Sequence, residues 1–160
     1  MDVLRSPWRL AYVTSAAQQA GCVLCRALET AGEARSLVVH TGPLCFVLMN
    51  LYPYNAGHLM ISPRRHVARL QDASSEELQE LMLLAQRAEV VLGETHRPEG
   101  LNVGINLGRT AGAGVEGHLH LHVVPRWNGD TNFMTVTGET RVIPEDPVAT
   151  AQRLRPLFAK

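Results

Sequence analysis

The chain lacks net charge, because its 15 Lys and Arg residues are balanced by 15 Asp and Glu residues in a length of 160. Without an overall positive field, neither long nucleic acid nor an anionic membrane is an expected partner. Residues 1–19 also lack the uninterrupted apolar run of a signal peptide or a membrane span. We therefore expect a cytoplasmic protein that holds any anionic ligand by local geometry.

Cysteine is scarce as well, and the sequence contains only Cys22, Cys25 and Cys45. This small, odd number argues against a disulfide framework. Cys22 and Cys25 stand at the Cys-x-x-Cys spacing, which points to metal or redox chemistry instead. A redox protein built on this pair requires a thioredoxin-like βαβ context, which the surrounding sequence lacks.

No internal repeat, charge block or low-complexity linker interrupts the sequence, so we expect one domain over residues 1–160. It divides into an N-terminal arm with the Cys-x-x-Cys pair, a core and a C-terminal extension: residues 1–34, 35–126 and 127–160. Short apolar runs bounded by turn-forming residues predict strands at residues 35–40, 44–48, 58–62, 101–107 and 117–126.

Two helices are predicted beside these strands. Ser74 and Glu77 form a capping-box pattern ahead of apolar residues at helical spacing, so the main helix is expected from Ser74 to near Gly93. A terminal helix is predicted at residues 148–158 and an edge strand at residues 134–137. Antiparallel strands packed by helices make an α+β domain.

Three histidines alternate with apolar residues in the last core strand. Because successive strand residues point to opposite faces, His118, His120 and His122 are expected on one face. With alternate residues about 6.6 Å apart, the row can offer a nucleophile, proton donors and metal ligands. The alternative is a solvated polar face, which would be preferred for a single histidine. Three in register predict a functional site.

A glycine-rich loop precedes the three histidines. Gly108, Gly112 and Gly114 allow the backbone to approach an anion closely and to direct N–H groups at it. Taken alone, the loop is equally well explained as a flexible hairpin connection. Beside the histidines it indicates a phosphate-binding loop.

The run from His118 to Val124, His-Leu-His-Leu-His-Val-Val, resembles the signature of the histidine triad family: His, apolar, His, apolar, His, apolar, apolar. The similarity extends over most of the chain, through Asn50, His58, His66, Asn106, Ala111-Gly112 and Pro125-Arg126. Asn-Leu-Tyr-Pro-Tyr-Asn and Pro-Arg-Trp-Asn-Gly-Asp-Thr-Asn-Phe resemble the bacterial branch of diadenosine tetraphosphate phosphorylases and hydrolases. The resemblance implies the family's fold, an antiparallel sheet of about five strands with one long helix and a C-terminal helix.

The same resemblance implies a nucleotide hydrolase or nucleotidyl transferase that acts at the α-phosphate of dinucleoside polyphosphates. His120 would be the nucleophile that carries the nucleotide, and His122 would hydrogen-bond a phosphate or leaving-group oxygen. A neutral imidazole is independently a good nucleophile towards phosphorus near neutral pH. Neither a catalytic metal nor an organic cofactor is expected. The implied nucleotide-binding residues are Asn50 at the ribose, His58 near the pocket, Asn106 near the phosphates, and Gly112 and Gly114 in the loop.

The resemblance also implies a structural zinc ion and a homodimer. Branches with an N-terminal Cys-x-x-Cys pair use it with two histidines, which match His66 and His118 beside Cys22 and Cys25. The alternative is two buried thiols and a surface histidine. Two subunits would meet side by side through the main helix and the adjoining strand.

Two rival functions stay open on the sequence. One is a nucleoside phosphoramidate hydrolase, because these substrates present the same α-phosphorus. The other is a zinc-stabilised nucleotide-binding regulator with little turnover, against which the intact His120 argues. The base, the leaving group and the acceptor, water or phosphate, do not follow from these residues.

Overall fold

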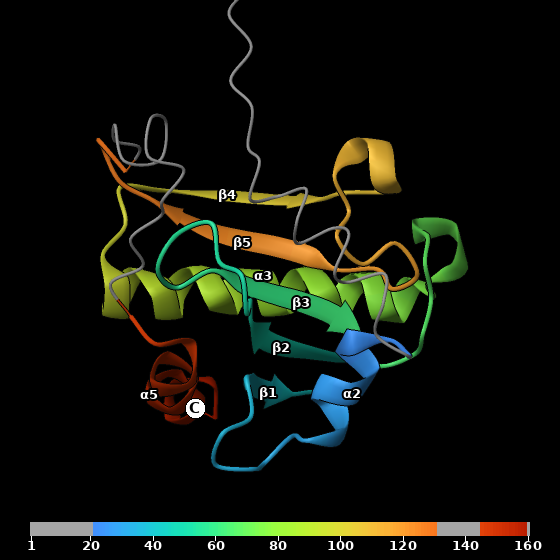
Figure 1. The fold of residues 1–160 in the computed structure, drawn as a ribbon, viewed down its shortest axis with the longest axis horizontal. Coiled ribbons are helices and arrows are strands. Elements are labelled where there is room, and N and C mark those ends of the chain that lie inside the picture. Colours follow the sequence, from blue (N-terminus) through green and yellow to red (C-terminus); the bar gives the residue numbers. More distant parts are fainter. Residues whose placement is uncertain (1–20, 131–144, 160) are drawn as a thin grey trace, which may run out of the picture.

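Five antiparallel strands form one sheet in the structure, a computed structural model that describes residues 21–130 and 145–159 (Figure 1). The strands lie in the order β1-β2-β3-β5-β4, so β1 and β4 are the edges. Their bounds are β1 Val38–Thr41, β2 Cys45–Met49, β3 Leu59–Pro63, β4 Gly100–Ile105 and β5 Leu121–Arg126. The described helices are α2 Val23–Glu29, α3 Ser75–His96 and α5 Pro147–Phe158, with short 3-10 helices η1 Leu70–Asp72 and η2 Arg109–Ala111. The predicted α+β class is confirmed.

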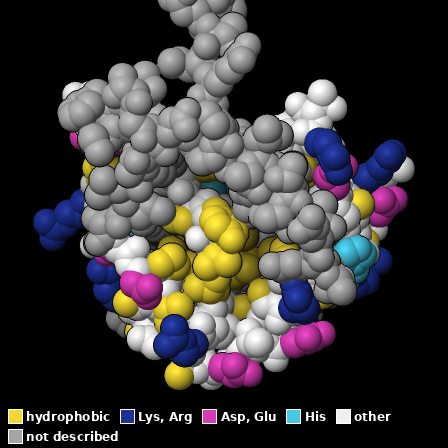
Figure 2. All heavy atoms as spheres, in the orientation of Figure 1, with side chains coloured by type: hydrophobic (Ala, Val, Ile, Leu, Met, Phe, Trp, Pro, Cys, Tyr) yellow, Lys and Arg dark blue, Asp and Glu magenta, His cyan; other side chains and the backbone are white. Residues whose placement is uncertain are grey.

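Apolar residues are buried on both faces of the sheet. α3 crosses the rear face in Figure 1 and packs on β2, β3 and β5, while α5 packs on β1 and β2. The strand residues that face these helices include Val47, Met49, Leu59, Ile61, Leu121 and Val123. On the front face, Phe46, Leu48 and Met60 pack with Leu24 of α2. Figure 2 shows hydrophobic side chains in the middle of this front face and charged ones around its rim.

The main helix begins as predicted and ends later. Ser74 accepts a hydrogen bond from the N–H of Glu77, whose side chain accepts from the N–H of Ser74, so the capping box is confirmed. The expected end near Gly93 is wrong, because α3 continues to His96. A glycine costs a helix only about 1 kcal/mol, and packing of the last turn offsets that cost. His96 packs there against Gly57, since a Cβ added to Gly57 would lie 3.0 Å from the His96 ring.

The N-terminal arm and the last core strand also differ from the expectation. α2 was not predicted, and a helix of seven residues depends on tertiary contacts, here those of Leu24. β5 begins at Leu121 rather than at residue 117, because pairing with β3 starts at Ile61 opposite Leu121. The predicted edge strand at residues 134–137 lies outside the described residues.

The described helices are all too short or too polar to cross a bilayer.

An ion pair between a buried carboxylate and a largely exposed guanidinium joins the start of α3 to the segment after β3. The Glu77 side chain is only 2% exposed and accepts two hydrogen bonds from Arg65, at 2.7 and 2.6 Å. Arg65 also donates to the carbonyl of Asp72. The hydrogen bonds from Arg65 hold the pKa of Glu77 below its usual value. Because His66 follows Arg65, this pair also fixes the backbone that carries a predicted metal ligand.

Replacing this buried carboxylate should destabilise the fold in a pH-dependent way. Glu77→Gln should lower the free energy of unfolding by about 1–3 kcal/mol at neutral pH, because a buried charge-assisted pair is broken. Folding lowers the pKa of Glu77, so its contribution is fully present above the unfolded pKa and is lost as pH falls through the folded value. Urea unfolding at neutral and acidic pH measures both effects. Glu76→Gln, an exposed neighbour in the same helical turn, is the control, and equal losses in both variants would contradict this account.

Candidate functional site

His58, which directly precedes β3, forms a hydrogen-bonded pair with His122 of β5. Nε2 of the buried His58 lies 3.0 Å from Nδ1 of His122. The N–H of Tyr54 donates to Nδ1 of His58 at 3.0 Å, and Nδ2 of Asn50 approaches the same atom at 3.4 Å. Because Nδ1 of His58 is an acceptor, the neutral ring carries its proton on Nε2 and donates it to His122. The neutral His122 ring must then carry its own proton on Nε2.

His120 holds its proton on the other ring nitrogen. Its Nδ1 lies 2.7 Å from the carbonyl oxygen of His118, which can only accept, so the lone pair of the neutral ring is on Nε2. Burial lowers the pKa of His120, which keeps the ring neutral near pH 7. The rings of His120 and His122 meet edge to face with their centroids 4.9 Å apart. A ring nitrogen that can attack thus lies beside a ring that can donate a proton.

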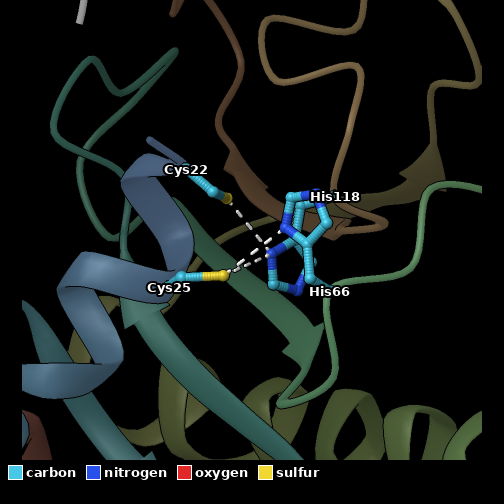
Figure 3. A group of neighbouring side chains, drawn as sticks. All are labelled: Cys22, Cys25, His66 and His118. Carbon is cyan, nitrogen blue, oxygen red and sulfur yellow. Dashed lines mark hydrogen bonds between the residues drawn. The ribbon is translucent and has the colours of Figure 1, made fainter. Parts of the chain in front are cut away.

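Cys22, Cys25, His66 and His118 come together at the start of α2 (Figure 3). Nδ1 of His118 lies 3.3 Å from Sγ of Cys22 and 3.5 Å from Sγ of Cys25. Nδ1 of His66 lies 3.5 Å from Sγ of Cys25. All four atoms lie within 4.8 Å of one another. Four residues from three distant parts of the sequence thus direct their donor atoms at one point.

The donor set fits a tetrahedral zinc ion. Zinc bonds of about 2.0–2.3 Å place tetrahedral ligands about 3.3–3.8 Å apart, which agrees with the three sulfur–nitrogen contacts of 3.3, 3.5 and 3.5 Å. Nε2 of His118 lies 2.8 Å from the carbonyl of Pro63, which can only accept, so Nδ1 keeps the lone pair that a metal needs. The predicted set of Cys22, Cys25, His66 and His118 is therefore one spatial cluster.

The predicted row of three histidine rings is divided in the structure: His118 pairs with His66, and His120 pairs with His122. Only His122 lies within β5, and His118 and His120 precede the strand. The intervening Leu119 is held by its N–H to the carbonyl of Val67 instead of a ladder partner. His118 turns to the cysteines, where its ring centroid lies 5.0 Å from that of His66. The three histidines therefore serve two neighbouring sites.

Strand register relates Asn106 to the triad. Gly104 of β4 lies opposite His122, and continuing this register past the end of β4 places Asn106 opposite His120. A Cβ on Gly104 would meet nothing within 4 Å, so this position of β4 has room for a side chain. Among the described residues no hydrogen bond joins Asn106 to a triad ring.

The glycine-rich loop before His118 contains η2. Gly108 and Gly112 flank η2 with φ of 80° and 91°, values that favour glycine. Between the described residues, no hydrogen bond links Gly114 to the triad. Arg109 and Glu116 bridge the loop with an ion pair of 2.6 Å.

Several residues around His58 were missed by the sequence analysis. The Tyr54 ring lies against both His58 and His122, with centroid distances of 4.9 and 5.9 Å. Asn55 donates to Asp130, which is paired with Arg126. The two motifs that contain these residues were noted only for their resemblance. The contacts of Asn55 join two segments about 70 positions apart in the sequence. The residue spacing within either motif does not reveal these contacts.

The family model described as HIT domain matches residues 31–129. The chain belongs to the histidine triad (HIT) family. Relatives of this HIT chain include the AP-4-A phosphorylase of Mycobacterium tuberculosis, which is 50% identical over 113 residues. That match covers 71% of the chain and 58% of the relative, so the chain spans little more than half the length of this phosphorylase. The bis(5'-adenosyl)-triphosphatase of Dictyostelium discoideum is 35% identical over 130 residues, which cover 78% of the chain and 87% of the relative.

Solved structures share the HIT fold. A Zn-bound histidine triad family protein from Mycobacterium smegmatis superposes with a TM-score of 0.69 at 26% identity, over 87% of this chain and 94% of that one. The NitFhit protein of C. elegans superposes with a TM-score of 0.61 at 28% identity, over 75% of this chain and 27% of that one.

Proposed function

We propose that this HIT chain is a nucleotide hydrolase or nucleotidyl transferase that acts at the α-phosphate of Ap4A-like dinucleoside polyphosphates. The observation that carries the proposal is the pair of opposite tautomers at His120 and His122, whose rings are 4.9 Å apart. A phosphoryl displacement needs a lone pair on one side and a proton donor beside it. The relatives named AP-4-A phosphorylase and bis(5'-adenosyl)-triphosphatase agree with this substrate class.

The reaction divides into two displacements. Nε2 of His120 attacks the α-phosphorus, and the P–O bond to the leaving nucleotide breaks as the P–N bond forms. The Nε2 proton of His122 is donated to the developing oxyanion of the leaving group. Water or phosphate then attacks the nucleotidyl-His120, the P–N bond breaks, and the incoming group returns a proton to His122. Two inversions give net retention at phosphorus.

The nucleotide-binding residues surround this pair in the proposal. Asn50 and His58 lie on the hydrogen-bond chain that ends at His122, and we assign them to the nucleoside side of the site. The register of β4 supports Asn106 as a contact to the phosphates. The backbone N–H groups of the loop around Gly112 and Gly114 complete the phosphate site without requiring net positive charge.

Removing the nucleophile should abolish turnover and spare binding. His120→Asn keeps a polar side chain but no basic ring nitrogen, so turnover of diadenosine tetraphosphate should fall by about three or more orders of magnitude. Its affinity for the nucleotide, measured by calorimetry, should stay within about threefold. His40→Asn, on β1 of the same sheet, is the control and should keep wild-type turnover.

Stereochemistry gives a second test of the covalent intermediate. Turnover of a chiral α-phosphorothioate substrate should proceed with retention. Inversion, or near-normal turnover by His120→Asn, would mean that the three histidines only bind the nucleotide. Either result would favour the alternative of a nucleotide-binding regulator. Parallel assays with an adenosine phosphoramidate test the alternative of a nucleoside phosphoramidate hydrolase. Running each assay with and without inorganic phosphate shows whether water or phosphate accepts the nucleotide.

We further propose that Cys22, Cys25, His66 and His118 hold a structural zinc ion. The convergence of their donor atoms within 4.8 Å and the proton on Nε2 of His118 support the assignment. The ion would cross-link α2, the segment after β3 and the start of the triad, and no step of the reaction passes through it. A Zn-bound family member has the same fold.

Protein purified without chelator should contain about one zinc per chain, the stoichiometry of a closed structural site. Cys25→Ala should lose the metal and lower the melting temperature. Cys45→Ala, in the core outside the cluster, should keep the zinc although it also loses a thiol. Elemental analysis and thermal unfolding measure both effects. Zinc-free wild type, or full zinc content in Cys25→Ala, would refute the assignment.

We also propose a homodimer formed through α3 and β4. Val103 lies opposite Val123, so it projects on the face covered by α3, yet it is 49% exposed. Met82, Leu83 and Val90 on α3 are exposed by 57%, 56% and 58%. An edge strand and a helix with apolar residues facing solvent together favour burial against a second copy.

Light scattering at micromolar concentration should therefore give the mass of two chains. Val90→Glu should shift the protein to monomers, because it would bury a charge in the interface. Leu70→Glu, which changes an exposed apolar residue on η1, should stay dimeric. A monomeric wild type would exclude the dimer.

A further inference from the structure

A hydrogen-bonded network joins the end of β5 to the loop before His58. Arg126 donates to both carboxylate oxygens of Asp130, at 2.5 and 2.9 Å. Nδ2 of Asn55 donates to Oδ2 of Asp130 at 2.8 Å and to the carbonyl of Pro125 at 2.9 Å. The remaining arm of Arg126 donates to Asn102 of β4 at 2.9 Å. The network thus ties three separate segments to one carboxylate.

Asp130 is held in its charged form in this network. Its hydrogen bonds with Arg126, Asn55 and the N–H of Trp127 hold its pKa well below the usual range. The carboxylate therefore remains an acceptor near neutral pH. Charge-assisted bidentate bonds of this kind are both stronger and more directional than neutral ones.

The loop from residue 50 to residue 58 packs on the domain through the buried Pro53 and Gly57. The carbonyl of Asn55 accepts from the N–H of His58 at 3.2 Å, and the side chain of Asn55 reaches β5 and Asp130. The Asn55 side chain therefore ties this loop to β5 and to Asp130.

The same loop determines the proton position on the histidines. The N–H of Tyr54, next to Asn55, donates to Nδ1 of His58, and this bond forces the His58 proton onto Nε2 and towards His122. If the loop shifts and this bond is lost, Nδ1 of His58 keeps the longer contact of 3.4 Å to Nδ2 of Asn50, so the Nε2–H tautomer is held less firmly. His122 would then lose the fixed Nε2 proton that faces the leaving group.

We propose that Asn55, Asp130 and Arg126 are positioning residues that fix the His58 tautomer and, through it, the proton donor His122. They touch no reacting atom in this scheme. Their effect on turnover rests on the proposed function, whereas their effect on the ring protons does not.

The decisive experiment compares Asn55→Ala with Asn102→Ala in the full chain. Both variants remove one carboxamide from the same network, but only Asn55 belongs to the loop before His58. Long-range ¹H–¹⁵N spectra of ¹⁵N-histidine protein report which ring nitrogen carries the proton, with His122→Gln used for assignment. Wild type and Asn102→Ala should show single Nε2–H tautomers at His58 and His122. Asn55→Ala should show mixed tautomers at both.

Kinetics provide the second measurement on the same proteins. Asn55→Ala should lower kcat for diadenosine tetraphosphate by about tenfold or more and leave KM within about threefold, because a transition-state interaction is lost. Asn102→Ala should match wild type. Asp130→Asn, which keeps the shape of the side chain but loses its charge, should fall between the two and serves if Asn55→Ala fails to fold. Restoration by Asp130→Glu would support a role for the charge.

A single Nε2–H tautomer at His122 in both Asn55→Ala and Asp130→Asn would overturn the proposal, even if activity fell. Equal tautomer mixing in Asn102→Ala would overturn it as well, because the loop would then not be the link. If the tautomers shift as expected while wild type turns over no dinucleoside polyphosphate, the proposed function fails and the positioning role stands.

Discussion

His118 contacts two sites at once, and the rest of the functional region depends on how this one residue is held. Its Nε2–H is fixed on the carbonyl of Pro63, so Nδ1 faces the two cysteines with its lone pair. Its backbone carbonyl accepts the Nδ1 proton of His120. The side chain thus belongs to the proposed metal site, while the backbone sets the tautomer of His120, the proposed nucleophile. The two proposed sites are therefore linked through a single residue.

Opposite tautomers on neighbouring rings are the second consequence of this arrangement. His120 is fixed by a backbone acceptor and His58 by a backbone donor, so Nε2 carries a lone pair in His120 and a proton in His122. Neither assignment needs a charged partner. Burial keeps His120 neutral, since desolvation disfavours the imidazolium. A site of this kind can bind and process an anion in a chain with no net charge.

The segments that complete the site are anchored by polar contacts in addition to their apolar packing. The loop from residue 50 to residue 58 is anchored to β5 through Asn55 and Asp130, and the segment after β3 is anchored to α3 through Arg65 and Glu77. Both anchors use a carboxylate whose pKa is lowered by an arginine. Directional bonds to charged groups fix orientation more sharply than apolar contacts do, which suits segments that place histidine rings.

The sequence alone determined the antiparallel α+β sheet, the capping box at Ser74 and the family, because strand alternation, helical spacing and the His-x-His-x-His pattern are local properties. It also named the four metal-cluster residues, through resemblance. Only the tertiary structure decided that His118 turns away from His120 and that Asn55 meets Asp130. Those outcomes depend on contacts between residues far apart in the chain, such as His118 with Cys22 and Asn55 with Asp130. The alternation of residues within one strand does not predict such contacts.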